Sequence, residues 1–191
     1  KNQLVLTGQI NDVGAYTRTN VANSFRQGIE AEFGIQPLIW LTWTGNATLS
    51  KNKIKNFIEY TDNYDTWGQD SIAYSETDIA FSPTIIASST VTIEPIKNLK
   101  LNFISKYVGE QYLDNTSTSS RKLDAFFVND FRINYSIKTK IVPEIGFVLS
   151  INNIFNEVYE SNGYTWGYIY GGQRTTENFY YPQAGTNFMA G

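Results

Sequence analysis

The 191-residue sequence contains no cysteine, no histidine and only one methionine. Without cysteine, the chain has no disulfide framework, no thiol nucleophile and no thiolate metal ligand. Without histidine, it also lacks the usual transition-metal ligand and the usual general base. The composition therefore favours neither an enzyme nor a cofactor-dependent protein, and we predict no catalytic residue, no cofactor and no metal site.

An excess of basic residues and long apolar runs are missing too. The net charge is −3, which gives no electrostatic reason to expect a nucleic-acid partner. No window approaches the roughly 20 apolar residues that a transmembrane helix needs, and no signal-peptide pattern opens the sequence. Strand-like sequence begins at once, in residues 1–6, so we expect the chain to start inside a longer protein.

Aromatic residues are abundant instead, with 13 Tyr, 12 Phe and 4 Trp, and such residues favour strands. Apolar and polar residues alternate with a period of two along most of the chain, which is typical of half-buried strands. The sequence predicts an all-β, antiparallel protein. Its strands are expected near residues 1–10, 23–35, 40–58, 82–94, 99–109, 123–137, 143–157 and 179–191.

Short and long connections alternate along the chain. Tight turns are expected at residues 36–38, 94–98 and 138–140, whereas long polar loops are expected at residues 60–81, 110–122 and 158–178. Transmembrane β-barrels have this arrangement, with short periplasmic turns and long extracellular loops. A soluble β-sandwich, whose core produces the same alternation within strands, is the alternative.

In a barrel, the two faces of each strand have different surroundings. The polar side chains expected to point into the lumen are Glu30, Glu32, Thr42, Thr44 and Asn46. The aromatic residues expected near the membrane interfaces are Phe25, Phe33, Trp40, Trp43, Tyr107 and Tyr135.

Three short motifs strengthen the barrel interpretation. They are Arg26-Gln27-Gly28-Ile29-Glu30, then the Asn153–Tyr159 stretch NIFNEVY, then Tyr181-Pro182-Gln183-Ala184-Gly185. In this order, ending near the C-terminus, they resemble the C-terminal barrel segment of TonB-dependent outer-membrane receptors.

The resemblance implies that residues 1–191 supply about eight strands of a larger, roughly 22-stranded barrel, as its C-terminal part, without the plug domain. It further implies a receptor in the outer membrane of a Gram-negative bacterium that imports a ligand with energy from the TonB system. The implied partners are outer-membrane lipid, the rest of the barrel with its plug, and an extracellular small ligand such as a ferric siderophore or another nutrient. The TonB complex would act only indirectly on this segment.

Two aromatic stretches, Tyr60–Trp67 and Tyr164–Tyr170, are candidates for ligand binding, because rigid rings stack on flat ligands with little loss of conformational entropy. The alternative is that they pack the loops together or anchor the membrane interface. The candidate residues are Tyr64, Trp67, Tyr164, Trp166, Tyr168 and Tyr170.

An acidic group in the loop at residues 60–81 contains Asp62, Asn63, Asp65 and Asp70. Oxygen ligands of this kind bind Ca²⁺, but Tyr64 occupies a ligand position of the EF-hand spacing. A solvated loop is therefore the better interpretation.

Two other functions stay open at this point. A complete eight-stranded outer-membrane barrel could have a structural or adhesive role, with its interior filled by side chains. A soluble carbohydrate-binding β-sandwich would suit the aromatic loops but not the alternating lengths of the connections.

Overall fold

The computed structural model describes residues 3–21 and 23–191, which fold mainly into antiparallel strands. These residues contain no helix long and apolar enough to cross a membrane. The strands are β1 (Gln3–Ile10), β2 (Tyr16–Val21), β3 (Ser24–Leu38), β4 (Leu41–Asn63), β5 (Gly68–Asp78), β6 (Ile85–Ile96), β7 (Leu99–Val108), β8 (Gln111–Tyr112), β9 (Lys122–Leu123), β10 (Phe126–Ile137), β11 (Ile145–Asn152), β12 (Glu160–Tyr170), β13 (Gln173–Pro182) and β14 (Asn187–Ala190).

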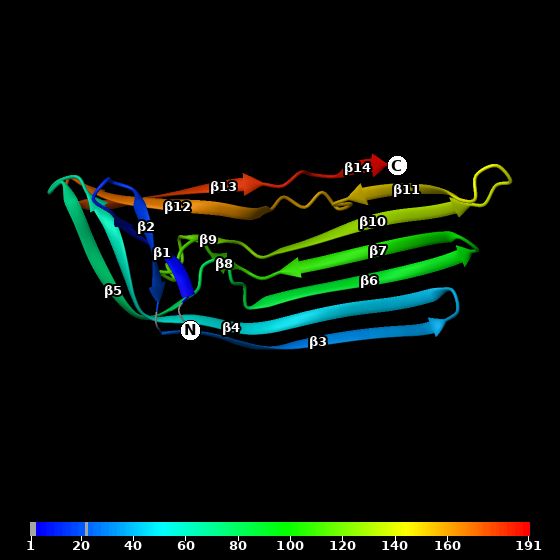
Figure 1. Cartoon of the computed structure of the whole chain (residues 1–191), viewed down its shortest axis with the longest axis horizontal. Coiled ribbons are helices and arrows are strands. Elements are labelled where there is room, and N and C mark those ends of the chain that lie inside the picture. Colours follow the sequence, from blue (N-terminus) through cyan, green and yellow to red (C-terminus); the bar gives the residue numbers. More distant parts are fainter. Residues whose placement is uncertain (1–2, 22) are drawn as a thin grey trace.

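One large sheet dominates the molecule. Its long strands pair in the order β3–β4–β6–β7–β10–β11–β14, and each neighbouring pair is antiparallel. The connections β3–β4, β6–β7 and β10–β11 lie together at one end of the sheet, whereas the β4–β5 and β12–β13 hairpins extend from the other end (Figure 1). The predicted short connections thus lie at one end of the sheet, and most of the stretches predicted as long loops form hairpins that extend from the other end.

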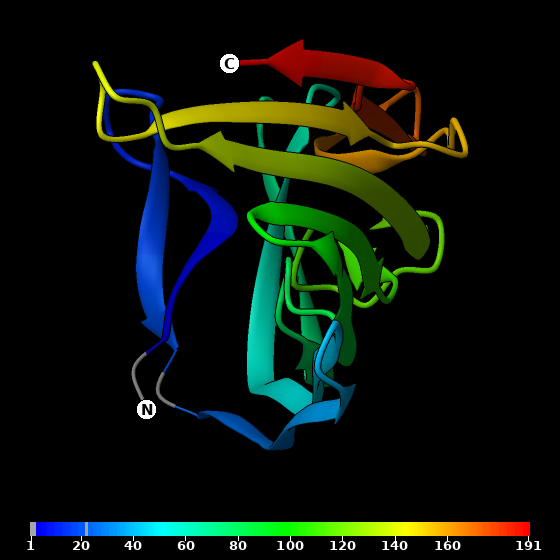
Figure 2. The same ribbon diagram turned by 90° about the vertical axis from the view of Figure 1, so that its right-hand side faces the viewer.

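The sheet is curled about its long axis, and the β1–β2 hairpin lies on its open side (Figure 2). The described residues form no second large sheet facing this one, so the soluble β-sandwich interpretation is wrong. The curl is what a barrel wall requires, because closing a sheet into a barrel tilts and bends its strands. The predicted antiparallel barrel segment is confirmed.

One face of the sheet is apolar across the strands. Pairing sets Trp43 opposite Val91, Val91 opposite Phe103, Phe103 opposite Phe131, and Phe131 opposite Ile151. Directly paired residues share a face, so these five side chains form one apolar row. Phe33 packs edge-on against Trp43 with ring centroids 4.8 Å apart, which extends this face to β3.

The opposite face is polar. Its next row consists of Thr42, Thr92, Asn102, Arg132 and Ser150. The Thr92 hydroxyl donates to Asn102 Oδ1 at 2.9 Å, and Arg132 Nε donates to Ser150 Oγ at 3.2 Å. Glu32 pairs with Asn46 and Glu30 with Thr48, so the residues predicted to point inward do share one face.

Ile54 shows which face is concave. It lies on β4 at an even number of residues from Thr44, with an unbroken β3–β4 register between the two, and therefore on the polar face. Ile54 is fully buried in a small apolar cluster with Val5 of β1, Phe57 and Ile79. The β1–β2 hairpin thus covers the polar face, which is the concave side of the sheet.

Several predicted boundaries were wrong. The stretch at residues 60–81 is not a loop, because β4 continues to Asn63 and pairs with β5. The stretch at 158–178 is largely the β12–β13 hairpin, and residues 110–122 contain β8 and the start of β9. The strand predicted at 179–191 is interrupted between Pro182 and Asn187.

The first predicted strand has a different role from the one expected. Residues 1–2 lie outside the described residues, and β1 pairs only with β2, in a separate two-stranded sheet. The predicted strand at 143–157 ends earlier, at Asn152, where a turn replaces it. That turn brings the Tyr159 ring to 4.4 Å from the Phe126 ring, over the small cluster of Val108, Phe126 and Val128.

Candidate functional site

Most of the predicted aromatic residues come together where two hairpins meet. Tyr164, Trp166 and Tyr168 alternate along one face of β12. The Trp166 and Tyr168 rings lie 4.9 Å apart, Tyr168 lies 5.8 Å from Tyr64, and Tyr64 lies 6.5 Å from Trp67. On β13, Phe179 stacks on Tyr164 at 4.7 Å, and Tyr181 lies 6.2 Å from Tyr164. We call these seven residues the aromatic ladder.

Ladder rings are accessible to solvent. Tyr64 and Trp166 are 39% and 37% exposed, and Trp67 is 88% exposed. Tyr170 shares their face of β12 but lies beyond the ladder, beside the β12–β13 turn, and is 69% exposed. Packing of the loops together accounts for the Tyr64–Tyr168 contact, whereas the exposed ring area fits ligand binding or an anchor at the membrane interface.

The tips of the β4–β5 and β12–β13 hairpins are fixed to each other. The Asp65 carboxylate accepts hydrogen bonds from the backbone N–H of Gly171 and of Gly172, both at 2.8 Å. The Tyr64 N–H donates to the Ile169 carbonyl at 2.9 Å. Gly171 and Gly172 have φ values of +61° and +70°, which glycine adopts without the steric cost of a Cβ. The turn therefore presents both N–H groups to one carboxylate.

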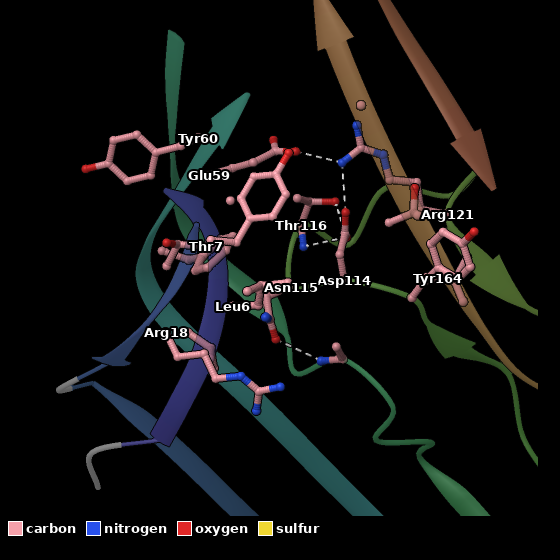
Figure 3. A pocket seen from close by; sticks show the side chains of 18 of the residues that line it. Leu6, Thr7, Arg18, Glu59, Tyr60, Asp114, Asn115, Thr116, Arg121 and Tyr164 are labelled. Atoms are coloured by element: carbon pink, nitrogen blue, oxygen red, sulfur yellow. Dashed lines mark hydrogen bonds and ion pairs between the residues drawn. The ribbon is translucent and has the colours of Figure 1, made fainter. Parts of the chain in front are cut away.

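A cavity of about 400 Å³ lies beside the ladder. Its walls come from the β1–β2 hairpin, β4, residues 113–121 and β12, and it is lined in part by Arg18, Arg26, Arg121, Tyr164 and Trp166. Figure 3 shows Arg121 with Glu59 and Asp114 on one side of the cavity and Arg18 away from them. The cavity can accommodate a small organic ligand, since ligand sites are typically about 300–1,000 Å³.

Gln69 and Asp62 hold the β1–β2 hairpin over this cavity. Gln69 Nε2 donates to the Gly8 carbonyl and to Asp62 Oδ1, both at 2.8 Å, and the Ile10 N–H donates to Gln69 Oε1 at 3.1 Å. The Tyr16 hydroxyl donates to Asp62 Oδ2 at 2.8 Å. Burial and this hydrogen bond raise the pKa of Tyr16, so its hydroxyl stays a donor at neutral pH.

An ionic cluster centred on Glu59 joins β4, β5, β13 and the 113–121 segment next to the cavity. Glu59, on β4, accepts from Arg121 at 2.7 Å, from the Tyr74 hydroxyl on β5 at 2.9 Å, and from Arg174 on β13. Arg121 also pairs with Asp114 at 2.8 Å and donates to Thr176 at 3.0 Å. The Arg121 side chain is only 6% exposed, and a buried cation of this kind needs such partners.

Opposing influences act on the Glu59 carboxyl. Burial opposes its ionisation, but hydrogen bonds from Arg174 and Arg121 outweigh burial, and the pKa of Glu59 is lowered. Burial and the contact with Glu59 raise the pKa of Tyr74. The cluster is thus a charged one at neutral pH, and it ties the hairpins together.

Sequence reasoning did not find the Glu59 cluster. Arg121 and Arg174 are 62 and 115 residues away from Glu59 along the chain, so no local spacing signals the contact. Topology alone brings β4, the 113–121 segment and β13 together.

The acidic residues considered as a calcium site have other contacts. Asp62 and Asp65 accept the hydrogen bonds described above, and Asp70 accepts from the Asn63 amide at 3.0 Å. Over residues 3–21 and 23–191, no three acidic side chains are grouped as a metal ion would require.

Comparison with known proteins gives one family and several similar folds. A family model described as TonB dependent receptor-like, beta-barrel, matches residues 1–154. No curated protein sequence matches the chain.

Three solved structures illustrate the likeness of fold. The siderophore receptor PiuA from Acinetobacter baumannii is 15% identical, with a TM-score of 0.68 over 99% of this chain and 23% of that one. The ferric-catecholate import receptor Fiu from E. coli K12 is 16% identical, with a TM-score of 0.58 over 100% of this chain and 23% of that one. A mutant of the ferric enterobactin receptor PfeA from Pseudomonas aeruginosa is 14% identical, with a TM-score of 0.52 over 100% of this chain and 27% of that one. The chain therefore spans about a quarter of the length of these structures.

Proposed function

The chain belongs to the TonB dependent receptor-like β-barrel family, and on that basis we propose that it forms part of the wall and the extracellular hairpins of an outer-membrane uptake receptor. Import would be energised by the TonB system and would involve no covalent chemistry, since the family is one of receptors and not an enzyme class. The host would be a Gram-negative bacterium, with the outer membrane as the site of action.

The two faces of the main sheet carry this proposal. An apolar convex row that includes Val91, Phe103 and Phe131 suits contact with lipid tails, and a polar concave row that includes Thr92 and Asn102 suits a lumen. Transmembrane barrels have this outward-apolar, inward-polar alternation. Outer-membrane lipid is therefore the proposed neighbour of the convex face.

The edges of the sheet support a larger barrel. Among the described residues, the outer edges of β3 and β14 pair with no other strand. Unpaired backbone groups are costly in lipid, so only closed barrels cross membranes as sheets. We propose that further strands pair with both edges, that residues 1–191 form the C-terminal part of the barrel, and that the plug domain comes from another part of the receptor.

The hairpin end of the molecule would face the outside of the cell and bind the ligand. The aromatic ladder and the adjoining cavity provide stacking surfaces and polar groups there. A ferric siderophore or another nutrient would be the ligand. We propose that Tyr64, Trp67, Tyr164, Trp166 and Tyr168 contact it, with Tyr170 at the rim.

Fractionation and crosslinking in the native host would test this function without knowledge of the ligand. The full-length receptor is expected in the outer-membrane fraction, released only by detergent, and to form a crosslinked adduct with the TonB protein. Recovery in a soluble fraction, or the absence of an adduct under conditions that crosslink a known receptor, would overturn the proposal.

A further inference from the structure

Three lysines continue the apolar convex face of β4 toward the hairpin end of the molecule. Lys51, Lys53 and Lys55 lie at an even number of residues from Trp43, and the pairing of β4, first with β3 and then with β5, is unbroken from Trp43 to Lys55. They therefore point to the same convex face as Trp43. We call these three residues the lysine row.

We propose that the lysine row binds the phosphate groups of a phosphorylated lipid in the outer leaflet of the membrane. This assignment rests on the proposed position of the chain in the outer membrane, and it adds a specific site and the chemistry of the lipid head group. Its support is the height of the row on the strand, the apolar surface directly below it and the charges around it.

The lysine row begins where the apolar band of a barrel ends. From Leu41, which follows the β3–β4 turn, to Lys51 the strand rises about 33 Å at roughly 3.3 Å per residue. At a strand tilt of about 40°, this rise is about 25 Å along the barrel axis, and the apolar band of a transmembrane barrel is also about 25 Å tall. The row therefore lies at the outer edge of the band and beyond it, at the level of lipid head groups.

Directly below the row, the convex face is apolar and exposed. Pairing sets Ile29 opposite Leu49 and Leu49 opposite Ile85, and all three side chains are exposed. The convex positions of β4 from Leu41 to Leu49, with their partners on β3 and β6, include no charged residue. Acyl chains would lie against this surface, and the attached head group would then meet the lysines. A lipid uses both parts of the face, whereas a free phosphate ion uses only one.

Two lysines of the row can pair with an anion. In the part of the chain that the structure describes, Lys51 forms no ion pair. Lys55 lies 4.0 Å from Glu76, and both of these side chains are exposed, so their contact contributes little. Lys53 differs, because Asp78 holds it at 2.7 Å.

Acidic residues border the row on the β5 side. Asp78 and Glu76 belong to β5, whereas β3 places Gln27 opposite Lys51, and the Gln27 amide can donate a hydrogen bond to a phosphate oxygen. A phosphate that approaches over β3 therefore meets donors and no carboxylate. Lys51 and Lys55 are roughly 13 Å apart along the strand, which suits a head group with two phosphates.

Binding of lipid A, a glycolipid with two phosphates, would test the assignment. The full-length receptor in a non-ionic detergent would be titrated with lipid A and with dephosphorylated lipid A, in EDTA so that no divalent cation bridges phosphate to a carboxylate. We expect saturable binding of lipid A that 0.5 M NaCl weakens, and binding of the dephosphorylated form that is about tenfold weaker or more. Inorganic phosphate at 10 mM should not compete. Lys51→Ala and Lys55→Ala should each weaken binding of lipid A about fivefold.

Matched variants separate loss of charge from loss of the site. Lys97→Ala combined with Lys138→Ala removes two exposed lysines that follow β6 and β10 at the other end of the sheet, and it should leave binding unchanged. Lys51→Arg keeps the cation and should bind lipid A as the unchanged receptor does. Glu76→Gln removes the acidic neighbour of Lys55 and should strengthen binding. The midpoint of denaturant unfolding would show that each variant is folded.

Several outcomes would overturn the assignment. They are no saturable binding of lipid A, equal binding with and without its phosphates, or equal losses in the lysine-row variants and in the variant at the other end of the sheet. Competition by inorganic phosphate would also overturn it, because the site would then be one for the free ion. Outer-membrane fractionation and the adduct with the TonB protein do not depend on the lysine row, so the proposed function and this assignment fail separately.

Discussion

Asn153, directly after β11, has a backbone φ of 50° and is only 4% exposed. Its Nδ2 donates to the carbonyls of Glu157 and Ala184, at 2.9 and 3.2 Å, and its Oδ1 accepts from the Glu157 N–H at 2.8 Å. Its own N–H donates to Asp130 on β10 at 2.8 Å. The side chain of Asn153 therefore joins the turn to the segment before β14, and its backbone N–H joins the turn to β10.

Replacing Asn153 tests this role. Asn153→Ala should lower the free energy of unfolding by about 2–4 kcal/mol, because it leaves buried polar groups unpaired and places Ala at a positive φ. The midpoint of denaturant unfolding in detergent would measure the loss. Asn162→Ala removes a side chain whose only hydrogen bond among the described residues is accepted from the adjacent Gly163 N–H, and it should cost less than about 1 kcal/mol. Equal losses for the two variants would contradict the proposed role.

Glu59 should make the stability of the hairpin end depend on pH. Because its pKa is lowered in the folded state, its stabilisation is fully present above the ordinary pKa of Glu, about 4.3. The stabilisation is lost as the pH falls through the lower, folded-state pKa. Glu59→Gln should cost about 2–3 kcal/mol at pH 7 and reduce the loss of stability on acidification.

The free energy of unfolding, measured between pH 3 and 7, would show the smaller loss of stability in Glu59→Gln. Glu76→Gln, which removes an exposed partner 4.0 Å from Lys55, is the matched control, and its free energy of unfolding should depend on pH as in the unchanged receptor. If the free energy of unfolding of Glu59→Gln depends on pH as steeply as that of the unchanged receptor, the assigned direction of the pKa shift is refuted.

Strands and hairpins differ in how well the sequence predicts them. β6, β7 and β10 were predicted to within a few residues, because an apolar face and a polar face produce a period of two along a strand. β5 was missed, because most of its residues on both faces are exposed and no apolar alternation results. It forms through backbone pairing with β4, which a sequence pattern does not record.

The candidate site was likewise predicted only in part from the sequence. The aromatic residues of β12 were found because rings in a polar stretch are conspicuous, yet their contact with Tyr64 depends on the docking of two hairpins. That docking uses Asp65, a residue whose sequence context pointed only to a solvated loop.

Asp65→Ala should release the two hairpin tips from each other. Loss of two charge-assisted hydrogen bonds is expected to speed amide hydrogen exchange at Gly171 and Gly172 by roughly tenfold or more. Mass spectrometry of the exchanged receptor would detect it. Asp12→Ala, in the β1–β2 turn, should leave exchange at these glycines unchanged. If Asp65→Ala also leaves it unchanged, the tips are held by other contacts.

At the scale of the whole molecule, a charged substitution should destabilise the barrel more on one face of the sheet than on the other. Val91→Arg places a cation on the proposed lipid face and should destabilise the barrel by about 2–4 kcal/mol, whereas Thr90→Arg on the concave face should cost about 1 kcal/mol or less. Unfolding of both variants in lipid bilayers would compare them. A larger cost for Thr90→Arg would reverse the assignment of the faces.

The sequence predicted this two-faced sheet because apolar and polar residues alternate in the same way along its long strands. It did not predict the separate β1–β2 sheet over the concave face, since Val5 and Ile54 meet only after the chain has folded. The cavity, and with it the position of any ligand, depends on that long-range contact.

The most direct test of the central claim is the intact mass of the native protein, extracted from outer membranes with detergent and identified by peptides from residues 3–191. If these strands are part of a larger receptor barrel, the mass should be several times the 21.7 kDa of this chain. A native, folded species near 21.7 kDa would contradict the account and leave the small closed barrel as the better interpretation.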